Sequence, residues 1–438
     1  MAYNPFQKRL GETLQPEDFQ TLITQQVSEG YYIEYKREMP NKTKIARSLA
    51  SLANTYGGWY IVGMETNEHN VATAVPGFNC TSCHDPISVV RDLAKHYIDP
   101  VPIFFPQAVI LNTENLVLAI YVPDNQETPF ITKDGRIYRR TYDSSDPIPE
   151  ASRYALDQLV ERGREVSQQF ARFSQDERSF SEAEDDGWLK IYISPYPLGS
   201  IQRPTLLSTS VISDLLEVSK KPIQFSFFNS KSNISGNIKF NAAYPTSNSV
   251  IFRQTSIQNE AFNSLTIELD NVGRARIFIP LQRVKFQEHR FSDIRSSTVR
   301  QQIMNRLKEN GERKETYLNF FDIGKTWLII VLLVHYYLDW LGIQTFLTGF
   351  QVAVELDDVW RYVPFYDCDS WGKQVEQFGL PVLMRSRIHI PPKEGSGYIV
   401  NIDSDLCFDL CVNTGLACGL PPEFFIDSLG QILEDAMT

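Results

Sequence analysis

The hydrophobic and polar positions of residues 28–63 predict a strand, an amphipathic helix and a second strand. The helix is indicated by apolar residues at three- and four-residue spacing, namely Ile45, Leu49 and Leu52. The helix is preceded by Asn41, a good N-cap residue, and ended by two C-terminal stop signals, Asn54 and Gly57. The glycine pair at 57–58 then leads into a continuous apolar run, residues 59–62, of strand type. This part of the sequence therefore predicts a strand, helix, strand unit.

Similar patterns extend this unit to about residue 173. Helices are predicted within residues 5–27, starting at Pro16, and over 86–98 and 150–173. Further strands are predicted at 104–111, 116–122 and 136–140. The stretch 174–187 is acidic and poor in apolar residues, which is typical of an interdomain linker.

The pattern changes at Trp188 to short apolar runs separated by Pro, Ser and Asn. Strands are predicted at 188–193, 223–228, 249–253, 265–269 and 275–279, with a hairpin turn at 270–273. A short helix is expected near 210–219, and later helices at 298–310, 327–340 and 421–437. Two more strands are expected at 350–356 and 382–390. We therefore expect an α+β protein with an N-terminal α/β domain over 1–173, a linker over 174–187, and a β-rich then mixed α+β region over 188–438 with a sub-boundary near 295.

Composition and charge narrow the function classes. The chain of 438 residues has a net charge of −11, and its pI of about 5.2 argues against a protein that binds nucleic acid over a broad basic surface. Residues 1–150 hold 13 Lys and Arg against 18 Asp and Glu, a net charge of −5. A local basic groove remains compatible with these values. The N-terminus has no secretory pattern, and no apolar stretch is long enough to span a membrane. We therefore expect a cytoplasmic protein with no membrane partner.

Candidate chemistry is concentrated on the first strand. Residues two apart in a strand share a face, so Glu34 and Lys36 point the same way. A turn at Gly30 would bring Glu29 toward them. Two carboxylates suit a hard cation such as Mg²⁺ or Mn²⁺, and a lysine beside them suits a phosphate. The alternative is an ordinary half-buried strand with solvated charges on one face.

A second group of polar residues lies on the last strand of the domain and just before it. Its basic residues are Lys133, Arg136, Arg139 and Arg140. Together with Tyr138 they suit contacts to a nucleic-acid backbone and stacking on bases. The alternative role of these charges is to keep an edge strand from aggregating.

The six cysteines provide a candidate metal site. Cys80 and Cys83 have the spacing of a zinc-ligand pair, and His84 or the distant cysteines 407, 411 and 418 would have to complete it. The alternative, free thiols in a reduced compartment, needs no such convergence.

The ordered motifs of residues 15–160 resemble the Schlafen AlbA-like domain, also called a divergent AAA or DNA-binding domain. The resemblance rests on the order E-x4-E-Y-K at residues 29–36, S-L-A-N-T-Y-G-G at 51–58 and Y-I-V-G at 60–63. It continues through V-P-G at 75–77, I-D-P at 98–100, T-P at 128–129 and G-R-I-Y-R at 135–139. Asn54, Gly57, Gly58 and Gly63 belong to the structural motif. Arg139 is the arginine that the family motif matches.

The resemblance implies a nucleic-acid-binding α/β domain. In the Schlafen branch it implies a metal-dependent endoribonuclease that acts on structured RNA such as tRNA. That branch uses three acids, of which Glu29 and Glu34 match the first two. Thr66 stands where the third, an aspartate, is expected, so Glu65 or Glu68 would have to replace it.

Two alternatives to catalysis follow from the same residues. One is a non-catalytic DNA- or RNA-binding module, and the other is a protein-interaction protein that has lost the active site. Residues 188–438 resemble no family, and a homo-oligomer or protein contact is expected through them.

Overall fold

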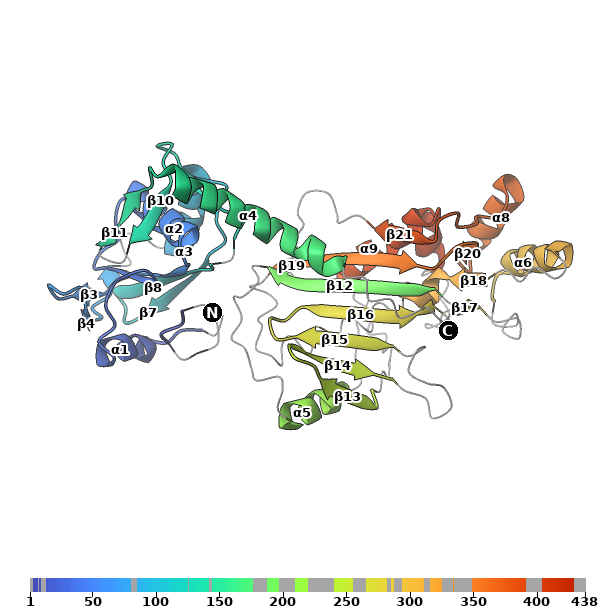
Figure 1. The fold of residues 1–438 in the computed structure, drawn as a ribbon, viewed down its shortest axis with the longest axis horizontal. Coiled ribbons are helices and arrows are strands. Elements are labelled where there is room, and N and C mark those ends of the chain that lie inside the picture. The colour runs from blue at the N-terminus through green and yellow to red at the C-terminus, as the bar shows by residue number, and fades with distance from the viewer. Residues whose placement is uncertain are drawn as a thin grey trace. The chain divides into compact units, whose positions relative to one another are not determined.

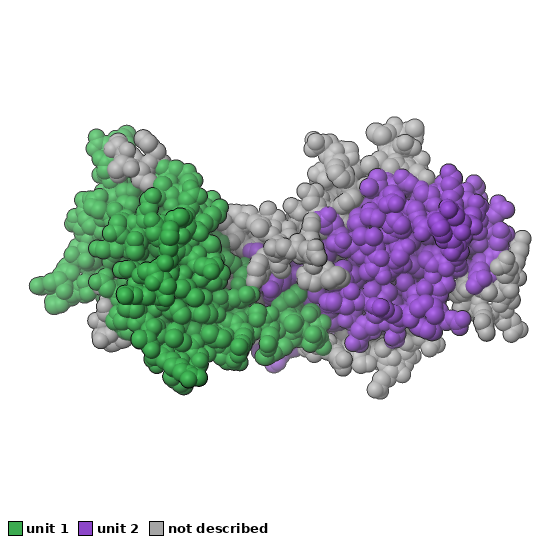
Figure 2. All heavy atoms as spheres, turned by 90° about the horizontal axis from the view of Figure 1, so that it is seen from above, with its two compact units in different colours: residues 1–175, 196–202, 342–348 green, residues 176–195, 203–341, 349–438 purple. Residues whose placement is uncertain are grey.

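The computed structural model describes residues 3–6, 8, 13–79, 85–124, 126–141, 144–175, 187–196, 209–219, 240–254, 265–281, 285–286, 294–310, 316–324, 334, 349–390 and 404–428. Helices and strands are mixed throughout, which confirms the expected α+β class (Figure 1). The chain divides into two compact units: residues 1–175, with 196–202 and 342–348, and residues 176–195, 203–341 and 349–438 (Figure 2). The predicted strand 223–228, residues 176–186 of the linker and the candidate zinc residues 80–84 lie outside the described residues.

The N-terminal unit is built on a five-stranded sheet. Its strand order is β1-β2-β8-β5, with β7 also paired to β8. The bounds are β1 Ile33–Lys36, β2 Gly58–Val62, β5 Phe78–Asn79, β7 Phe105–Ile110 and β8 Asn115–Val122. The β1–β2 pair is parallel and the other pairs are antiparallel. A parallel pair needs a crossover connection, and helix α2, Lys42–Asn54, supplies it.

Helices cover the two faces of this sheet. On one face, α2 and α3 (Pro86–Tyr97) pack their apolar sides onto Tyr60, Val62 and Leu118. On the other, α1 (Pro16–Thr24) packs onto Ile61 and Tyr121. The remaining elements of the unit are β3 Glu65–Thr66, β4 Ala72–Ala74, β6 Ile98–Asp99, β9 Ile131–Thr132, β10 Tyr138–Thr141, β11 Ser144–Pro149 and α4 Arg153–Ser174.

Most predicted elements of this unit occur within one to three residues of their expected bounds. The first helix begins at Pro16, as expected, and ends at Thr24. Its N-cap backbone amide donates to the Asp18 carboxylate, so the helix begins at this capping box. The predicted strand 136–140 begins two residues later, because residues 133–136 form a turn before β10.

The C-terminal unit contains a seven-stranded sheet of order β13-β14-β15-β16-β12-β19-β21. These strands are β13 Ala242–Pro245, β14 Ser249–Arg253, β15 Thr266–Asp270, β16 Ala275–Pro280, β12 Trp188–Tyr196, β19 Gly349–Asp357 and β21 Arg387–Ile390. A second sheet joins β17 Lys285–Phe286, β18 Thr316–Asn319 and β20 Tyr362–Phe365. The described helices are α5 Thr209–Ser219, α6 Ser297–Asn310, α8 Asp369–Phe378 and α9 Ser404–Ala417, and residues 320–324 and 422–428 are also helical.

The predicted strands at 188–193, 249–253, 265–269, 275–279 and 350–356 and the helices at 210–219 and 298–310 are confirmed. The expected strand 382–390 is confirmed only over its last four residues. Among the described residues, no helix has both the length and the apolar character needed to cross a membrane.

Candidate functional site

Successive side chains of β1 point to opposite faces of the sheet. Tyr35 belongs to the core beside α1, whereas the carboxylate of Glu34 accepts a hydrogen bond from Ser48 on α2. Lys36 points the same way as Glu34 and pairs with it. The period of two that the sequence predicted is therefore present.

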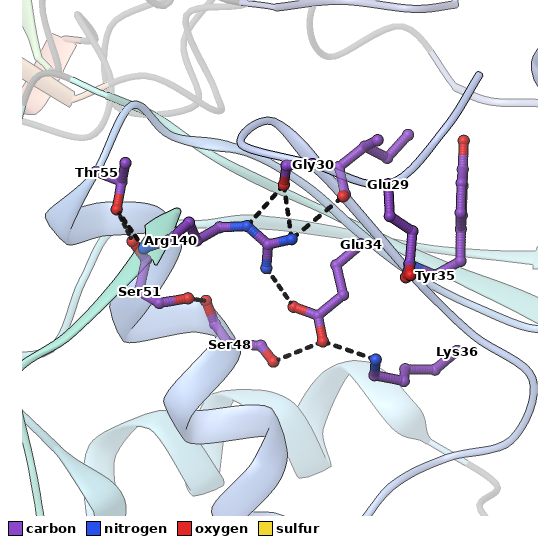
Figure 3. Close-up of polar contacts among 10 residues, drawn as sticks. Glu29, Gly30, Glu34, Tyr35, Lys36, Ser48, Ser51, Thr55 and Arg140 are labelled. Carbon is purple, nitrogen blue, oxygen red and sulfur yellow. Dashed lines mark hydrogen bonds and ion pairs between the residues drawn. The ribbon is translucent and has the colours of Figure 1, made fainter. Parts of the chain in front are cut away.

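Glu34 is the centre of a group of charges that are buried or partly buried, which we call the charge cluster: Glu29, Glu34, Lys36 and Arg140. The side chains of Glu34 and Arg140 are both 0% exposed, and Arg140 Nη1 lies 2.6 Å from Glu34 Oε2. The other oxygen, Oε1, lies 3.0 Å from Lys36 Nζ and accepts the Ser48 hydroxyl at 3.0 Å. Both oxygens of Glu34 are therefore engaged (Figure 3).

Arg140 connects β10 to the turn before β1. Its Nε and Nη2 donate to the carbonyl oxygen of Gly30 at 2.9 and 2.7 Å, and its backbone amide donates to the Thr55 hydroxyl at 2.9 Å. This corrects one expectation from the sequence, which placed Arg140 in a phosphate-contacting patch. A guanidinium with no exposed surface has an internal role, which here is to neutralise Glu34 and to hold the turn.

Glu29 approaches the cluster from that same turn. Its Oε1 accepts the backbone amide of Tyr35 at 2.6 Å. Burial raises the pKa of Glu29, and the negative charge of Glu34 adds to this effect. Burial alone would lower the pKa of Lys36, but the carboxylates of Glu34 and Glu29 raise it, and the pKa lies above its usual value. The two acids and Lys36 therefore lie close enough to influence one another, as the sequence predicted.

Tyr60 brings a further polar group to this region, which the sequence did not single out. Tyr60 is the register partner of Glu34 on β2. Its hydroxyl is buried without a hydrogen-bond partner among the described residues. Burial raises the pKa of this hydroxyl, and the charges of Glu34 and Glu29 raise it further. The phenol therefore provides an unused donor beside the carboxylates.

Glu65 is placed differently from the two acids of the cluster. It lies on β3, half-exposed, and its Oε1 accepts from Arg37 Nε at 2.7 Å. Thr66 and Glu68 are exposed near it. The described residues contain no group of three His, Cys, Asp or Glu side chains that could hold a metal ion. The assignment of a third acid stays a prediction.

The basic residues around β10 are divided between the interior and the surface. Tyr138 is buried, and its hydroxyl donates to Asp134 at 2.8 Å, which corrects its expected role in stacking on bases. Arg139 is half-buried and pairs with Glu150 at 3.2 Å. Arg136 and Lys133 are exposed in the turn before the strand. These last three keep a side chain within reach of solvent.

Asn54 connects α2 to the strands around residue 130. Its Nδ2 donates to the carbonyls of Phe130 and Tyr138, and its Oδ1 accepts the amide of Phe130 at 2.8 Å. The helix ends at Asn54, as the sequence predicted, and Gly57 follows with a φ of +66°. Asn54 is the side chain that fixes β10, and hence Arg140, against the helix.

Sequence reasoning missed the polar stripe on the buried side of α2. Ser48, Ser51 and Thr55 lie three and four residues apart on this side, and all three are buried. Ser48 donates to Glu34, and Thr55 accepts from Arg140. Polar residues within an otherwise apolar helix face were the available signal, because a buried hydroxyl needs a partner.

Comparison with known proteins confirms the resemblance over part of the chain. Residues 29–149 match the family model described as Schlafen, AlbA_2. No curated protein matches.

Two solved structures are similar to part of the chain. One is the DIP2311 protein from Corynebacterium diphtheriae, with 24% identity over 29% of this chain and a TM-score of 0.21. The other is the N-terminal domain of a protein from Nitrosomonas europaea named as related to the ATP-dependent DNA helicase RecG, with 21% identity over 30% of this chain and a TM-score of 0.22. The match covers 94% of that domain but only 25% of the DIP2311 protein.

Proposed function

We propose that the N-terminal unit binds nucleic acid through a basic surface at the N-terminal end of α2. This basic surface consists of Lys42, Lys44, Arg47, Lys133 and Arg136. The match of residues 29–149 to the Schlafen AlbA_2 family supports the proposal, and so does the local excess of basic side chains in an otherwise acidic chain.

The observation that carries the proposal is the first turn of α2. Lys42 and Lys44 are exposed there, and the turn contains no acidic residue. A helix N-terminus is the positive end of the helix dipole, so acids are favoured there and lysines are not. Helix α1 follows this rule, with Glu17 and Asp18 in its first turn. The lysines of α2 thus weaken the helix slightly and create a site attractive to anions.

Neighbouring residues extend this positive region onto the turn before β10. Arg47 lies one turn along the helix from Lys44 and pairs with Asp134 of that turn at 3.0 Å. Its guanidinium carbon lies 5.0 Å from the centre of the Tyr138 ring. Lys133, beside Asp134, lies 5.3 Å from the centre of the Tyr97 ring. Neither Lys42 nor Lys44 forms an ion pair with another described residue, so both are available to phosphates.

Replacing both lysines, as Lys42→Gln with Lys44→Gln, should weaken nucleic-acid binding about tenfold near 0.1 M salt. The slope of log affinity against log salt should fall by about 1.5 to 2, because each lost phosphate contact removes one counterion-release step. Fluorescence anisotropy with a labelled oligonucleotide at several salt concentrations measures both quantities.

Stability separates this outcome from misfolding. Gln has nearly the helix propensity of Lys, and removing positive charge from a helix N-terminus stabilises it by a few tenths of a kcal/mol. The variant should therefore unfold at the same or a slightly higher temperature while it binds less tightly. Lys373→Gln, an exposed change on α8 in the other unit, is the matched control. Equal affinity and salt slope in all three proteins would exclude this surface.

A second function, cleavage of structured RNA such as tRNA, is favoured by the convergence of Glu29, Glu34 and Lys36. In this proposal Glu29 and Glu34 hold Mg²⁺ or Mn²⁺, and Lys36 stabilises the phosphate. Burial raises the pKa of Glu29 and the charge of Glu34 adds to this effect, and a divalent cation between the two acids would relieve that added repulsion. It would supply charge neutralisation and an activated water at the phosphate.

The donor set fits such a cation in part. Glu29 has one oxygen bonded to the Tyr35 amide, and its other oxygen remains for a ligand. Glu34 has both oxygens engaged, so a cation at Oε1 would replace the ammonium of Lys36. Lys36 is 27% exposed on its side chain and can swing outward, whereas the fully buried Arg140 cannot.

Glu29→Gln is the variant that tests cleavage. It keeps the oxygen that accepts the Tyr35 amide and removes the charge, whereas a change at Glu34 would also disturb folding. We expect wild-type protein with Mn²⁺ to release discrete fragments from a tRNA pool. We expect none after chelation, and at least about 100-fold fewer with Glu29→Gln.

The two proposed functions fail in different ways. Fragments that persist in Glu29→Gln would come from another nuclease in the preparation and would remove the catalytic assignment. An absence of fragments together with salt-sensitive binding would leave binding alone.

A further inference from the structure

Four tyrosines form a partly exposed cluster near the C-terminal end of α2. This tyrosine cluster consists of Tyr3, Tyr31, Tyr32 and Tyr56. Tyr32 stacks on Tyr3 with ring centres 5.3 Å apart and planes at 25°. Tyr56 lies 5.5 Å from Tyr31 and 6.0 Å from Tyr32, measured between ring centres. Tyr32 and Tyr56 are 38% and 51% exposed, so two residues of this aromatic group reach solvent.

Two arginines lie beside this cluster. Arg162 on α4 donates from Nη1 to the carbonyl oxygen of Thr55, the residue next to Tyr56. Burial lowers the pKa of Arg162, and the positive charge of Arg139 lowers it further, while Asp124 acts in the opposite direction. The Nε atoms of Arg139 and Arg162 are buried without a hydrogen-bond partner among the described residues. Arg139 pairs with Glu150 at 3.2 Å, whereas Arg162 forms no ion pair among the described residues, so Arg162 supplies the positive charge beside the cluster.

We infer that the tyrosine cluster, with Arg139 and Arg162 beside it, is a stacking surface for the unpaired bases of a single-stranded nucleic acid. The inference rests on the proposed function, because it names the class of nucleic acid that the domain takes. Base stacking needs exposed aromatic faces, and the backbone that accompanies the bases needs positive charge nearby. The cluster and the arginines supply both.

The position of the cluster favours a single strand over a duplex. Bases in a duplex are stacked on one another and hide their faces, so an aromatic platform adds nothing to duplex binding. The basic surface lies at one end of α2 and Tyr56 follows the other end, after 13 helical residues, or about 20 Å. A flexible strand can contact both places at once.

The test compares a labelled single-stranded oligonucleotide with a duplex of the same sequence, using the full chain and fluorescence anisotropy. Tyr32→Leu with Tyr56→Leu removes the two exposed rings and keeps apolar volume. We expect single-strand affinity to fall about 10- to 100-fold and duplex affinity to change less than twofold. Tyr32→Phe with Tyr56→Phe keeps both rings and should bind as wild type does.

Two comparisons make the result decisive. Tyr244→Leu, at a residue 42% exposed on β13 of the other unit, should leave binding unchanged. Wild-type affinity in the double Leu variant, with binding lost in the Lys42 and Lys44 variant, would overturn the stacking inference and leave the proposed function standing. Wild-type protein that binds neither oligonucleotide at low salt would overturn both and make the tyrosines a surface for protein contacts.

Discussion

Replacing Arg140 with methionine should lower the free energy of unfolding of the N-terminal unit by about 3–5 kcal/mol. The change leaves the Glu34 carboxylate buried with one of its cationic partners removed, and the remaining partner, Lys36, is partly solvated. It also removes the donors that hold the carbonyl oxygen of Gly30. Because small domains are stable by only about 5–15 kcal/mol, much of the unit should unfold or open. Hydrogen exchange of peptides from β1 and β10, measured in the full chain, reports this loss directly.

The neighbouring Arg139→Met variant is the matched control. Arg139 precedes Arg140 on the same strand and forms a partly exposed pair with Glu150, so its loss should cost no more than about 1 kcal/mol. Adding Glu34→Gln to the Arg140 variant should recover part of the stability, because the uncompensated charge is then gone. Equal exchange rates in the Arg139 and Arg140 variants would contradict the internal role of Arg140 and return it to the phosphate-contacting patch.

The sequence predicted the parts of this site that depend on local periodicity. A strand has a period of two, so Glu34 and Lys36 had to share a face, and the structure pairs them at 3.0 Å. The apolar spacing in α2 and its Asn41 cap likewise defined a helix whose capping bond is present, with Asn41 accepting the amide of Lys44. Local chemistry alone determines such features.

The contacts that decide what Glu34 does come from a distant part of the chain. Arg140 is 106 residues away in sequence, and alternation along β10 indicated only that Arg140 and Tyr138 share a face. Which face is buried depends on how Asn54 attaches β10 to α2, and that attachment is tertiary. The guanidinium of Arg140, which the sequence assigned to contacts with phosphate, therefore stabilises the fold. The residues that we propose to contact phosphates are instead Lys42 and Lys44, which are exposed in the first turn of α2.

The acidic net charge of the chain and the basic surface are compatible, because charges act only over a short range in salt solution. Charge acts on a bound strand over about a Debye length, roughly 8–10 Å at physiological salt. The excess of acids over the whole chain therefore reduces long-range attraction without cancelling a local group of lysines and arginines. We accordingly expect association with nucleic acid to be slow for an electrostatically driven process and to depend strongly on salt.

Gly58→Ala should cost the N-terminal unit about 3 kcal/mol or more, because two separate penalties coincide at this position. Gly58 has a φ of +133°, a region that side chains rarely adopt. A Cβ there would also lie 2.2 Å from the carbonyl oxygen of Tyr32. That oxygen accepts the Trp59 amide at 2.7 Å, at the start of the β1–β2 pair. Backbone cannot move aside as a flexible side chain can, so the pairing of β1 with β2 must loosen.

Two other glycines separate these penalties. An added Cβ at Gly135 meets nothing within 4 Å although its φ is +75°, so Gly135→Ala should cost only the conformational part, about 1–2 kcal/mol. Gly30 has neither problem, and Gly30→Ala should lie within about 0.5 kcal/mol of wild type. Urea denaturation of the three variants measures the series.

Because Tyr32 carries one of the exposed rings of the tyrosine cluster, the Gly58 variant should also lose single-strand binding before it unfolds, whereas the Gly135 and Gly30 variants should retain it. A Gly58 variant as stable as the Gly135 variant would mean that the turn before β1 yields easily, and the position of the tyrosine cluster would then not depend on the β1–β2 pair.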